Sequence, residues 1–417
     1  MGRHKGRSFP TLGTSKSTRE VKGTLLDYYL KHGISPVCYL AKDLSKHLDR
    51  RQSLYNMLGL SGMLFRNAKV LEIAAGSGQN SLYVSAQQPS RFVIVEPNPV
   101  ALKQIEKTYR NFSTPHTCPE IIPVKLENYP PNELFDIVIC EGWLGSSSHE
   151  RSLVSTLADR VAPGGMLILT ALSISGWLSN LIRYCLVQKL LMNKPVDYDS
   201  RVTLVQKALS PHLETISGMT RRHEDWVKDN MVNPTYLDQG LTLEMILHEI
   251  SARGFTVFGA SPDFITEWRW FKQLYDSNAR TNENALECYE RNSHNFLDYR
   301  RIFDGRSLAL NRQLNPLCTA LLAALAQSKA KMPSELNRTY FYGIAKILRP
   351  IGKNLRSVST DLSAAIDEAI RLLNAPEVTP SAIAAMKHYK SWFGRETLYF
   401  SFVRAHNLPP EKQPNEY

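Results

Sequence analysis

Short apolar runs alternate with longer stretches of mixed polar and apolar residues through the middle of the chain. Four strong runs begin at Lys69, Arg91, Phe135 and Gly164, and a weaker one begins at Ile121; each has the length and apolar content of a buried strand. The stretches between most of these runs have the composition of helices. This β-α-β-α order predicts an α/β fold with a doubly wound parallel sheet.

The end of the predicted sheet has a different character. After residue 239 a helical stretch leads into two β-rich runs, and only a few residues around Pro262 join them. Such a short connection allows an antiparallel pair but leaves no room for a helical crossover. We therefore expect the sheet to end in a terminal antiparallel hairpin.

Helix-rich regions flank and interrupt this α/β domain. In the middle region, Trp177 begins a series of apolar residues at helical spacing, which predicts a helix with one apolar face. We expect that face to pack on the sheet domain, with a membrane-surface or substrate-lid role as the alternative. The predicted organisation is a basic tail and helical N-terminal cap over residues 1–66, an α/β domain over 67–275 with a helical insertion over 173–240, and a helical C-terminal domain over 276–417.

The net charge of +11 is concentrated at the two ends of the chain. Residues 1–66 hold 12 Lys and Arg against 4 Asp and Glu, whereas the middle of the chain is nearly neutral. This distribution favours a solvated basic tail over a nucleic-acid footprint. No run approaches the about 18 apolar residues of a membrane span, and the six cysteines include no C-x-x-C pair. We therefore expect a cytoplasmic protein with no membrane span, disulfide framework or metal site.

A glycine loop follows the first predicted strand, in the stretch VLEIAAGSGQNS from Val70 to Ser81. A dinucleotide-binding loop requires G-x-G-x-x-G, but the third glycine position is Ser81. A triphosphate-binding loop ends in Gly-Lys-Ser or Gly-Lys-Thr, and this loop contains no lysine. Both phosphate-binding interpretations are weakened.

The loop instead combines a carboxylate with two glycines. Glycine lets a ligand approach the backbone closely, while Glu72 suits a ligand with positive centres, such as the ammonium and sulfonium of S-adenosylmethionine (SAM). At the end of the second strand, 24 positions later, Glu96 is placed to accept hydrogen bonds from both hydroxyls of a ribose. The pattern predicts an adenosine-containing ligand without a pyrophosphate.

Four segments in order, VLEIAAGSGQ, VIVEPNP, FDIVICEGWL and ADRVAPGGMLILTAL, resemble the successive motifs of the Rossmann-like (class I) SAM-dependent methyltransferases. The resemblance covers residues 69–172 and 241–275 and implies SAM as cofactor. Two positions depart from the family pattern: Ala74 stands where the first loop glycine is usual, and Lys125 falls where an acidic residue often contacts adenine. The cofactor-binding residues that the resemblance implies are Glu72, Ala74, Gly76, Gly78, Glu96, Pro97, Leu126, Glu127 and Glu141.

Candidate catalytic residues come from two places. Glu141 and His149 follow the fourth strand, whose carboxyl end faces the ligand crevice of such folds. In the insertion, charged residues cluster between positions 221 and 229. This cluster is either a solvated helix face or a substrate clamp in which His223 or Asp225 takes a proton. The clamp would use Arg221, Arg222 and Asp225 for substrate binding and His223 for catalysis.

Three functions are compatible with these features. We favour a bacterial methyltransferase that modifies an O or N acceptor of a small molecule or carrier-linked metabolite, with a sugar among the candidates, because flanking segments are similar to bacterial methyltransferases of surface-glycan or specialised-metabolite assembly. An RNA methyltransferase that uses the basic termini is the first alternative, although no NPPY-type motif is present. A non-catalytic SAM-binding regulatory subunit is the second. The sequence does not indicate an oligomeric state.

Overall fold

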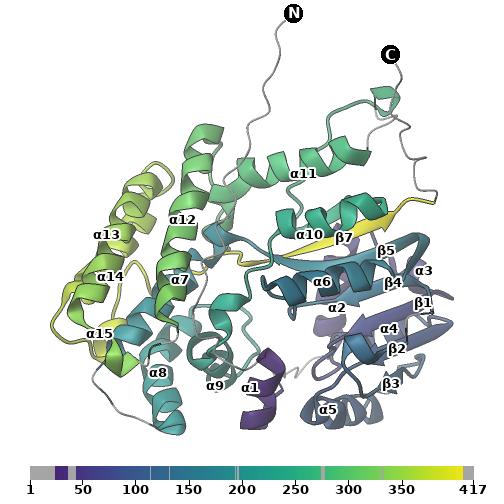
Figure 1. Cartoon of the computed structure of the whole chain (residues 1–417), viewed down its shortest axis with the longest axis horizontal. Coiled ribbons are helices and arrows are strands. Elements are labelled where there is room, and N and C mark those ends of the chain that lie inside the picture. Colours follow the sequence, from purple (N-terminus) through teal and green to yellow (C-terminus); the bar gives the residue numbers. More distant parts are fainter. Residues whose placement is uncertain are drawn as a thin grey trace, which may run out of the picture.

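A seven-stranded sheet forms one half of the molecule and a group of helices forms the other (Figure 1). The computed structural model describes residues 24–35 and 44–406, apart from residues 113, 131, 193, 195–196, 274–277, 330 and 332, so the basic tail expected at the N-terminus lies outside the described residues. The strands are β1 (Lys69–Ile73), β2 (Arg91–Val95), β3 (Glu120–Ile122), β4 (Phe135–Cys140), β5 (Val161–Leu172), β6 (Phe255–Ser261) and β7 (Thr397–Arg404).

The strand order is β3-β2-β1-β4-β5-β7-β6. The first five strands pair in parallel, and β7 pairs antiparallel with both β5 and β6. This arrangement confirms the predicted Rossmann-like, doubly wound α/β fold. Because Ile73 lies opposite both Val95 and Cys140, the carboxyl ends of β1, β2 and β4 meet at one edge of the sheet.

The predicted hairpin is wrong in its second strand. The partner of β6 is not the run after Pro262 but β7, which follows only after the helices of residues 278–384. The run after Pro262 has an aromatic, strand-like composition, yet its Trp268 is 90% exposed, whereas Phe400 and Phe402 of β7 are fully buried. Residues 276–417 are therefore not helical throughout, because they also supply the strand that completes the sheet.

Alternating strand residues face two separate layers of helices, as the strand period of two requires. Val70 packs in one core with α2, α3, α4 and α5, whereas Leu71 packs in another with α6, α10 and α11. Both layers are seen on the sheet side of Figure 1. These helices are α2 (Leu44–Met57), α3 (Gly62–Phe65), α4 (Ser81–Ala86), α5 (Pro99–Arg110), α6 (Ser148–Ala158), α10 (Leu243–Ile250) and α11 (Asn278–Asn292).

The insertion and the later helices share a single apolar core. Helix α7 is buried on nearly all sides and contacts α12, α13 and α14. The expectation that its apolar face packs mainly on the sheet domain is therefore wrong. None of the helices within the described residues has the length and apolar character needed to cross a membrane. The helices of this unit are α7 (Ile174–Leu191), α8 (Tyr198–Leu213), α9 (His223–Val227), α12 (Leu308–Ser328), α13 (Arg338–Leu355), α14 (Thr360–Asn374) and α15 (Pro380–Ala384).

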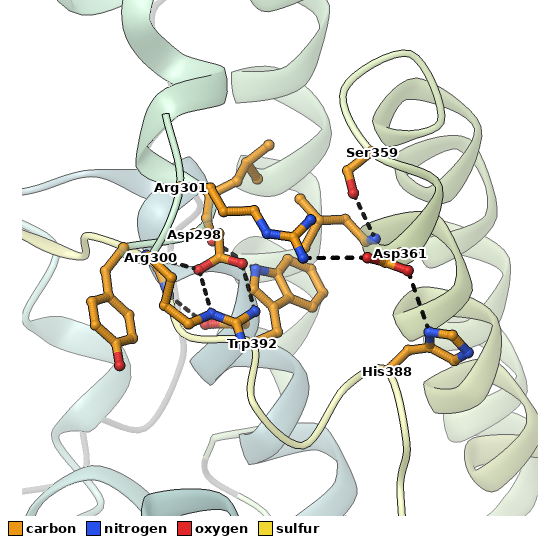
Figure 2. A network of polar contacts seen from close by, with 12 residues as sticks. Asp298, Arg300, Arg301, Ser359, Asp361, His388 and Trp392 are labelled. Carbon is orange, nitrogen blue, oxygen red and sulfur yellow. Dashed lines mark hydrogen bonds and ion pairs between the residues drawn. The ribbon is translucent and has the colours of Figure 1, made fainter. Parts of the chain in front are cut away.

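Polar contacts tie distant segments of this helical unit together (Figure 2). Asp361 at the start of α14 pairs with Arg301 at 3.3 Å and with His388 at 3.6 Å. The indole nitrogen of Trp392 donates a 2.6 Å hydrogen bond to the carbonyl of Leu297. These contacts fix the path of the chain immediately before it re-enters the sheet as β7.

Candidate cofactor and acceptor site

A cavity lies at the carboxyl ends of β1, β2 and β4 and is bounded on its other side by helix α1 (Leu25–His32). Open α/β sheets bind their ligands at this edge. Leu25 and Tyr29 of α1 contribute to its wall. Of the cofactor-binding residues inferred from the sequence, those that line the cavity are Glu72, Ala74, Gly76, Glu96, Pro97, Leu126, Glu127 and Glu141.

The glycine loop has three residues in the left-handed backbone region: Ala74 at φ 59°, Gly76 at 57° and Gly78 at 72°. A Cβ added at Gly76 would meet no atom within 4 Å, so the loop leaves room for a ligand to approach the backbone. A Cβ at Gly78 would lie 3.1 Å from Cγ1 of Ile105. Gly78 is not among the residues that line the cavity, and its small size allows close packing against α5. Its expected cofactor contact stays a prediction.

Glu96 closes β2 and is held rigidly by backbone donors. Its Oε2 accepts a 3.1 Å hydrogen bond from the amide of Gly76, and its Oε1 accepts a 2.9 Å bond from the amide of Asn98. Burial raises the pKa of Glu96, and these two hydrogen bonds oppose that rise. Each carboxylate oxygen keeps a further lone pair, so Glu96 can still accept hydrogen bonds from a ligand in the cavity.

Glu72 is buried at the end of β1 without a full set of partners. Its Oε2 has no hydrogen-bond partner, and burial raises the pKa of Glu72 to about 7. A buried polar atom without a partner costs free energy. A cationic group entering the cavity would supply the missing partner, so the side chain fits the ammonium of SAM.

Glu141, at the end of β4, is half of a buried ion pair. Its Oε1 lies 2.5 Å from Nη2 of Arg51 on α2, and the hydroxyl of Tyr55 donates to the same oxygen at 3.4 Å. These two contacts fix the Glu141 carboxylate at the wall of the cavity, where it stays a candidate both for a cofactor contact and for proton transfer. Sequence reasoning missed Arg51, although its spacing with Tyr55 and Leu58 puts an arginine on an apolar helix face.

His149 lies at the mouth of the cavity, near the start of α6. Its Nε2 is 3.1 Å from Oε1 of Glu127, and the His149 side chain is 63% exposed. His149 therefore remains a candidate base, paired with a carboxylate that can orient its ring.

Leu126, in the 3-10 turn after β3, is 2% exposed and forms an apolar part of the cavity lining.

Only one of the charged residues at positions 221–229 lines the cavity, namely Asp229. Arg221, Arg222, His223 and Asp225 do not line it. Arg222 instead forms ion pairs with Glu224 and Asp225 at 2.8 and 3.7 Å. These four residues lie before α9 or in its first turn and are outside the cavity lining. The π-helical turn that follows α9, Lys228–Val232, brings Asp229 into the lining.

Asp229 and Tyr29 meet across the acceptor side of the cavity. The hydroxyl of Tyr29 donates a 2.6 Å hydrogen bond to Oδ1 of Asp229, and Nη2 of Arg221 donates a 2.8 Å bond to Oδ2. Burial, with a contribution from Asp229, raises the pKa of Tyr29 well above its usual range, so its hydroxyl stays a donor. Trp143 and Gln239 also line the cavity, and no local sequence pattern singled out Tyr29 or Gln239.

Residues 46–208 match the family model for the methyltransferase domain. The chain is therefore similar to methyltransferases over these residues. This similarity supports the family and the SAM cofactor that the sequence motifs implied.

Two kinds of comparison add relatives of this domain. The chain is 32% identical over 114 residues to the tRNA U34 carboxymethyltransferase of Shewanella putrefaciens, a match that covers 27% of this chain and 33% of that protein. The chain thus spans about a third of the length of the curated relatives it matches. Similar solved structures include PKMT2 from Rickettsia typhi, with 15% sequence identity and a TM-score of 0.39; the match covers 60% of this chain and 51% of that one. Another is the N-methyltransferase NodS from Bradyrhizobium japonicum in complex with S-adenosylhomocysteine, with 18% sequence identity and a TM-score of 0.26; the match covers 31% of this chain and 64% of that one.

Proposed function

We propose that the protein transfers the methyl group of SAM to an O or N acceptor of a small molecule or carrier-linked metabolite, with a sugar among the candidate acceptors. The observation that carries this proposal is the pair of buried carboxylates, Glu72 and Glu96, which line the same cavity as Gly76 and its open space. When bound, SAM supplies an electrophilic methyl group on a sulfonium.

The described residues support a division of labour around that cofactor. Glu96 is suited to the ribose hydroxyls, Glu72 to the ammonium and Leu126 to the adenine face, while Gly76 gives the cofactor access to the backbone. Glu127 lines the cavity beside Leu126, but its contact with His149 competes with a role at adenine. The hydrogen bonds that the ribose hydroxyls and the ammonium would donate to the two carboxylates are charge-assisted, and such bonds are stronger than those between neutral groups.

The reaction needs an acceptor held in line with the methyl group. The acceptor atom forms its bond to the methyl carbon as the bond from carbon to sulfur breaks, and an acceptor hydroxyl or ammonium gives its proton to a base. Holding the two reactants in this geometry supplies much of the rate enhancement. His149, Glu141 and Asp229 are the candidate bases, because all three line the cavity, whereas His223 does not.

The charge of the cavity bears on the kind of acceptor. Six carboxylates and one lysine line it, and arginines offset two of the carboxylates, Glu141 and Asp229. The remaining charge is negative, so the site favours a neutral or cationic reacting group and disfavours a phosphate beside the methyl. The lysine is Lys125, and the carboxylates are Glu72, Glu96, Glu127, Glu141, Glu150 and Asp229.

RNA remains the second candidate acceptor. The curated relatives named tRNA U34 carboxymethyltransferase favour it, and so does the basic character of residues 1–66. Against it, the cavity itself is acidic, and nucleic-acid affinity depends mainly on contacts between cations and phosphates.

Incubation with isotope-labelled SAM separates these alternatives. The protein is mixed in parallel with a bacterial metabolite extract and with bulk tRNA, and products are analysed by mass spectrometry for the gain of one methylene unit. We expect labelled metabolites and unlabelled tRNA. If only tRNA is labelled, RNA is the acceptor and the proposed small-molecule acceptor is wrong. Tight binding of S-adenosylhomocysteine without any labelled product would favour the non-catalytic regulatory subunit.

Substitution of the two histidines tests the base. His149→Ala should lower turnover by at least about 10²-fold if His149 accepts the proton, while His223→Ala, the matched control, should leave turnover within about twofold. If neither variant loses activity, Asp229 becomes the better candidate, and Asp229→Asn is the variant that tests it.

A further inference from the structure

A second cavity lies on the opposite side of helix α1, between this helix and the start of α8. Figure 1 shows α1 beside α9 and close to α8, at the junction of the sheet domain with the helical unit. Thr24 lines both cavities, so they adjoin at the start of α1. The polar residues that line the second cavity are Thr24, Asp27, Tyr28, Lys31, His32, Tyr198, Arg201 and Thr235.

Aromatic contacts hold the walls of this second cavity in place. The rings of His32 and Tyr198 stack with their centroids 3.9 Å apart and an interplanar angle of 15°. The hydroxyl of Tyr198 lies 2.8 Å from that of Tyr28, which in turn donates a 2.8 Å hydrogen bond to the carbonyl of Lys228. The cavity is therefore built by three separate segments of the chain and does not depend on a single loose side chain.

The second cavity has a small excess of positive charge, because Lys31 and Arg201 line it together with one carboxylate, Asp27. Lys31 and Arg201 belong to two different helices, and within the part of the chain that the structure describes neither side chain has an ion-pair or hydrogen-bond partner. Asp27 keeps its negative charge, and its Oδ2 accepts hydrogen bonds from the amide and hydroxyl of Thr24, at 2.7 and 2.9 Å.

The neighbouring groups agree with a local excess of positive charge. Burial, Lys31 and Lys228 all lower the pKa of His32, and Asp199 is the neighbour that opposes them. Lys228 itself is paired with Glu224 at 2.5 Å. The free cations that remain for a ligand are thus Lys31 and Arg201, one on each wall.

We propose that this second cavity binds the phosphate-bearing part of the acceptor, as the diphosphate of a nucleoside-diphosphate-linked metabolite. The inference rests on the proposed function and deepens it, because it names the class of acceptor. Two unpaired cations beside an aromatic wall suit a diphosphate with an attached ring. The reacting group of the same acceptor would then enter the acidic cofactor cavity past Thr24, and each cavity would receive the charge that it complements.

Calorimetric titration of the full chain, saturated with S-adenosylhomocysteine, tests this assignment. The probes are uridine diphosphate, inorganic pyrophosphate and uridine. We expect uridine diphosphate to bind and uridine to bind at least about tenfold more weakly, because the phosphates carry the charge-assisted contacts. Binding of pyrophosphate would support the anion site and would show that the two phosphates are enough for binding.

Charge removal connects the binding to the two residues. Lys31→Ala with Arg201→Ala should weaken uridine diphosphate by at least about tenfold. The matched control, Lys353→Ala with Arg356→Ala at the exposed end of α13, removes the same charge and should change affinity by less than about twofold. Retained binding of S-adenosylhomocysteine by the Lys31 and Arg201 variant shows that it is folded.

The outcomes separate this inference from the proposed function. If neither uridine diphosphate nor pyrophosphate binds while S-adenosylhomocysteine does, the second cavity is not a phosphate site and the methyltransferase proposal stands. If uridine binds as well as uridine diphosphate, or both double variants bind the diphosphate equally, the inference is also wrong. If S-adenosylhomocysteine itself fails to bind to the unaltered chain, the proposed function fails.

Discussion

Replacing Glu72 by Gln should make the protein without cofactor more stable at neutral and alkaline pH. An unfolded Glu titrates near 4.5, whereas burial raises the pKa of Glu72 to about 7 in the folded state. The folded state therefore holds the proton more tightly, and its stability falls as pH rises from 4.5 through 7. At 1.36 kcal/mol per pH unit, this difference costs the folded state about 3 kcal/mol above pH 7. Glutamine stays neutral and avoids that cost.

Urea denaturation followed by tryptophan fluorescence, at pH values from 5 to 8.5, measures the effect. The advantage of Glu72→Gln over the unaltered chain should grow from about 1 kcal/mol near pH 5 to about 3 kcal/mol at pH 8. Glu106→Gln, at an exposed position of α5, is the matched control and should show a change within about 0.5 kcal/mol at every pH.

The same variant should lose affinity for the cofactor. The ammonium of S-adenosylhomocysteine would pair with the Glu72 carboxylate, so saturating ligand should stabilise the unaltered chain more than Glu72→Gln. A stability difference that does not change with pH, or a variant that binds the ligand as tightly as the unaltered chain, would refute this reasoning about Glu72.

Two further substitutions test the geometry around the cavity. Gly76→Ala should weaken S-adenosylhomocysteine by at least about tenfold in calorimetry, because a Cβ there fills open space and φ is +57°. Gly343→Ala, in the interior of α13 with equally open surroundings, should instead leave affinity unchanged and stabilise the fold by about 0.5–1 kcal/mol. Arg51→Ala should destabilise the protein by about 3–5 kcal/mol in urea denaturation, because it leaves the buried Glu141 unpaired; a cost below about 1 kcal/mol would show that the pair is not a buried unit.

The cofactor side of the site could be predicted from the sequence because its determinants are local. Glu72 and Gly76 lie on one strand and the loop that follows it, and Glu96 ends the next strand along the chain. Parallel pairing of β1 and β2 in register then brings them together without any further information. The two phosphate-binding interpretations were also weakened by local residues, because the loop lacks both a third glycine and a lysine.

The acceptor side could not be predicted, because its contacts join segments that are remote in the sequence. Tyr29 and Asp229 are 200 positions apart, and Arg51 and Glu141 are 90 apart. The sequence shows that charged residues gather at positions 221–229, but not which of them face the cavity. The π-helical turn after α9 decides that Asp229 lines the cavity while His223 does not.

The error at the end of the sheet has a related cause. Hydrophobic pattern predicts that a segment can be a strand, but not which strand it pairs with. The run containing Trp268 and the run containing Phe400 both have strand-like composition, and only the second is buried between β5 and β6. Proximity in the sequence favoured the wrong one, since β7 returns only after the helical unit is complete.

Titration of S-adenosylhomocysteine into the unaltered chain and into Glu96→Ala tests the central claim most directly. We predict a single binding site in the unaltered chain and a loss of about 1.5–3 kcal/mol in the variant, a weakening of about 10- to 150-fold, because the substitution removes charge-assisted hydrogen bonds to the ribose. The account would be contradicted if the unaltered chain did not bind, or if both proteins bound with the same affinity.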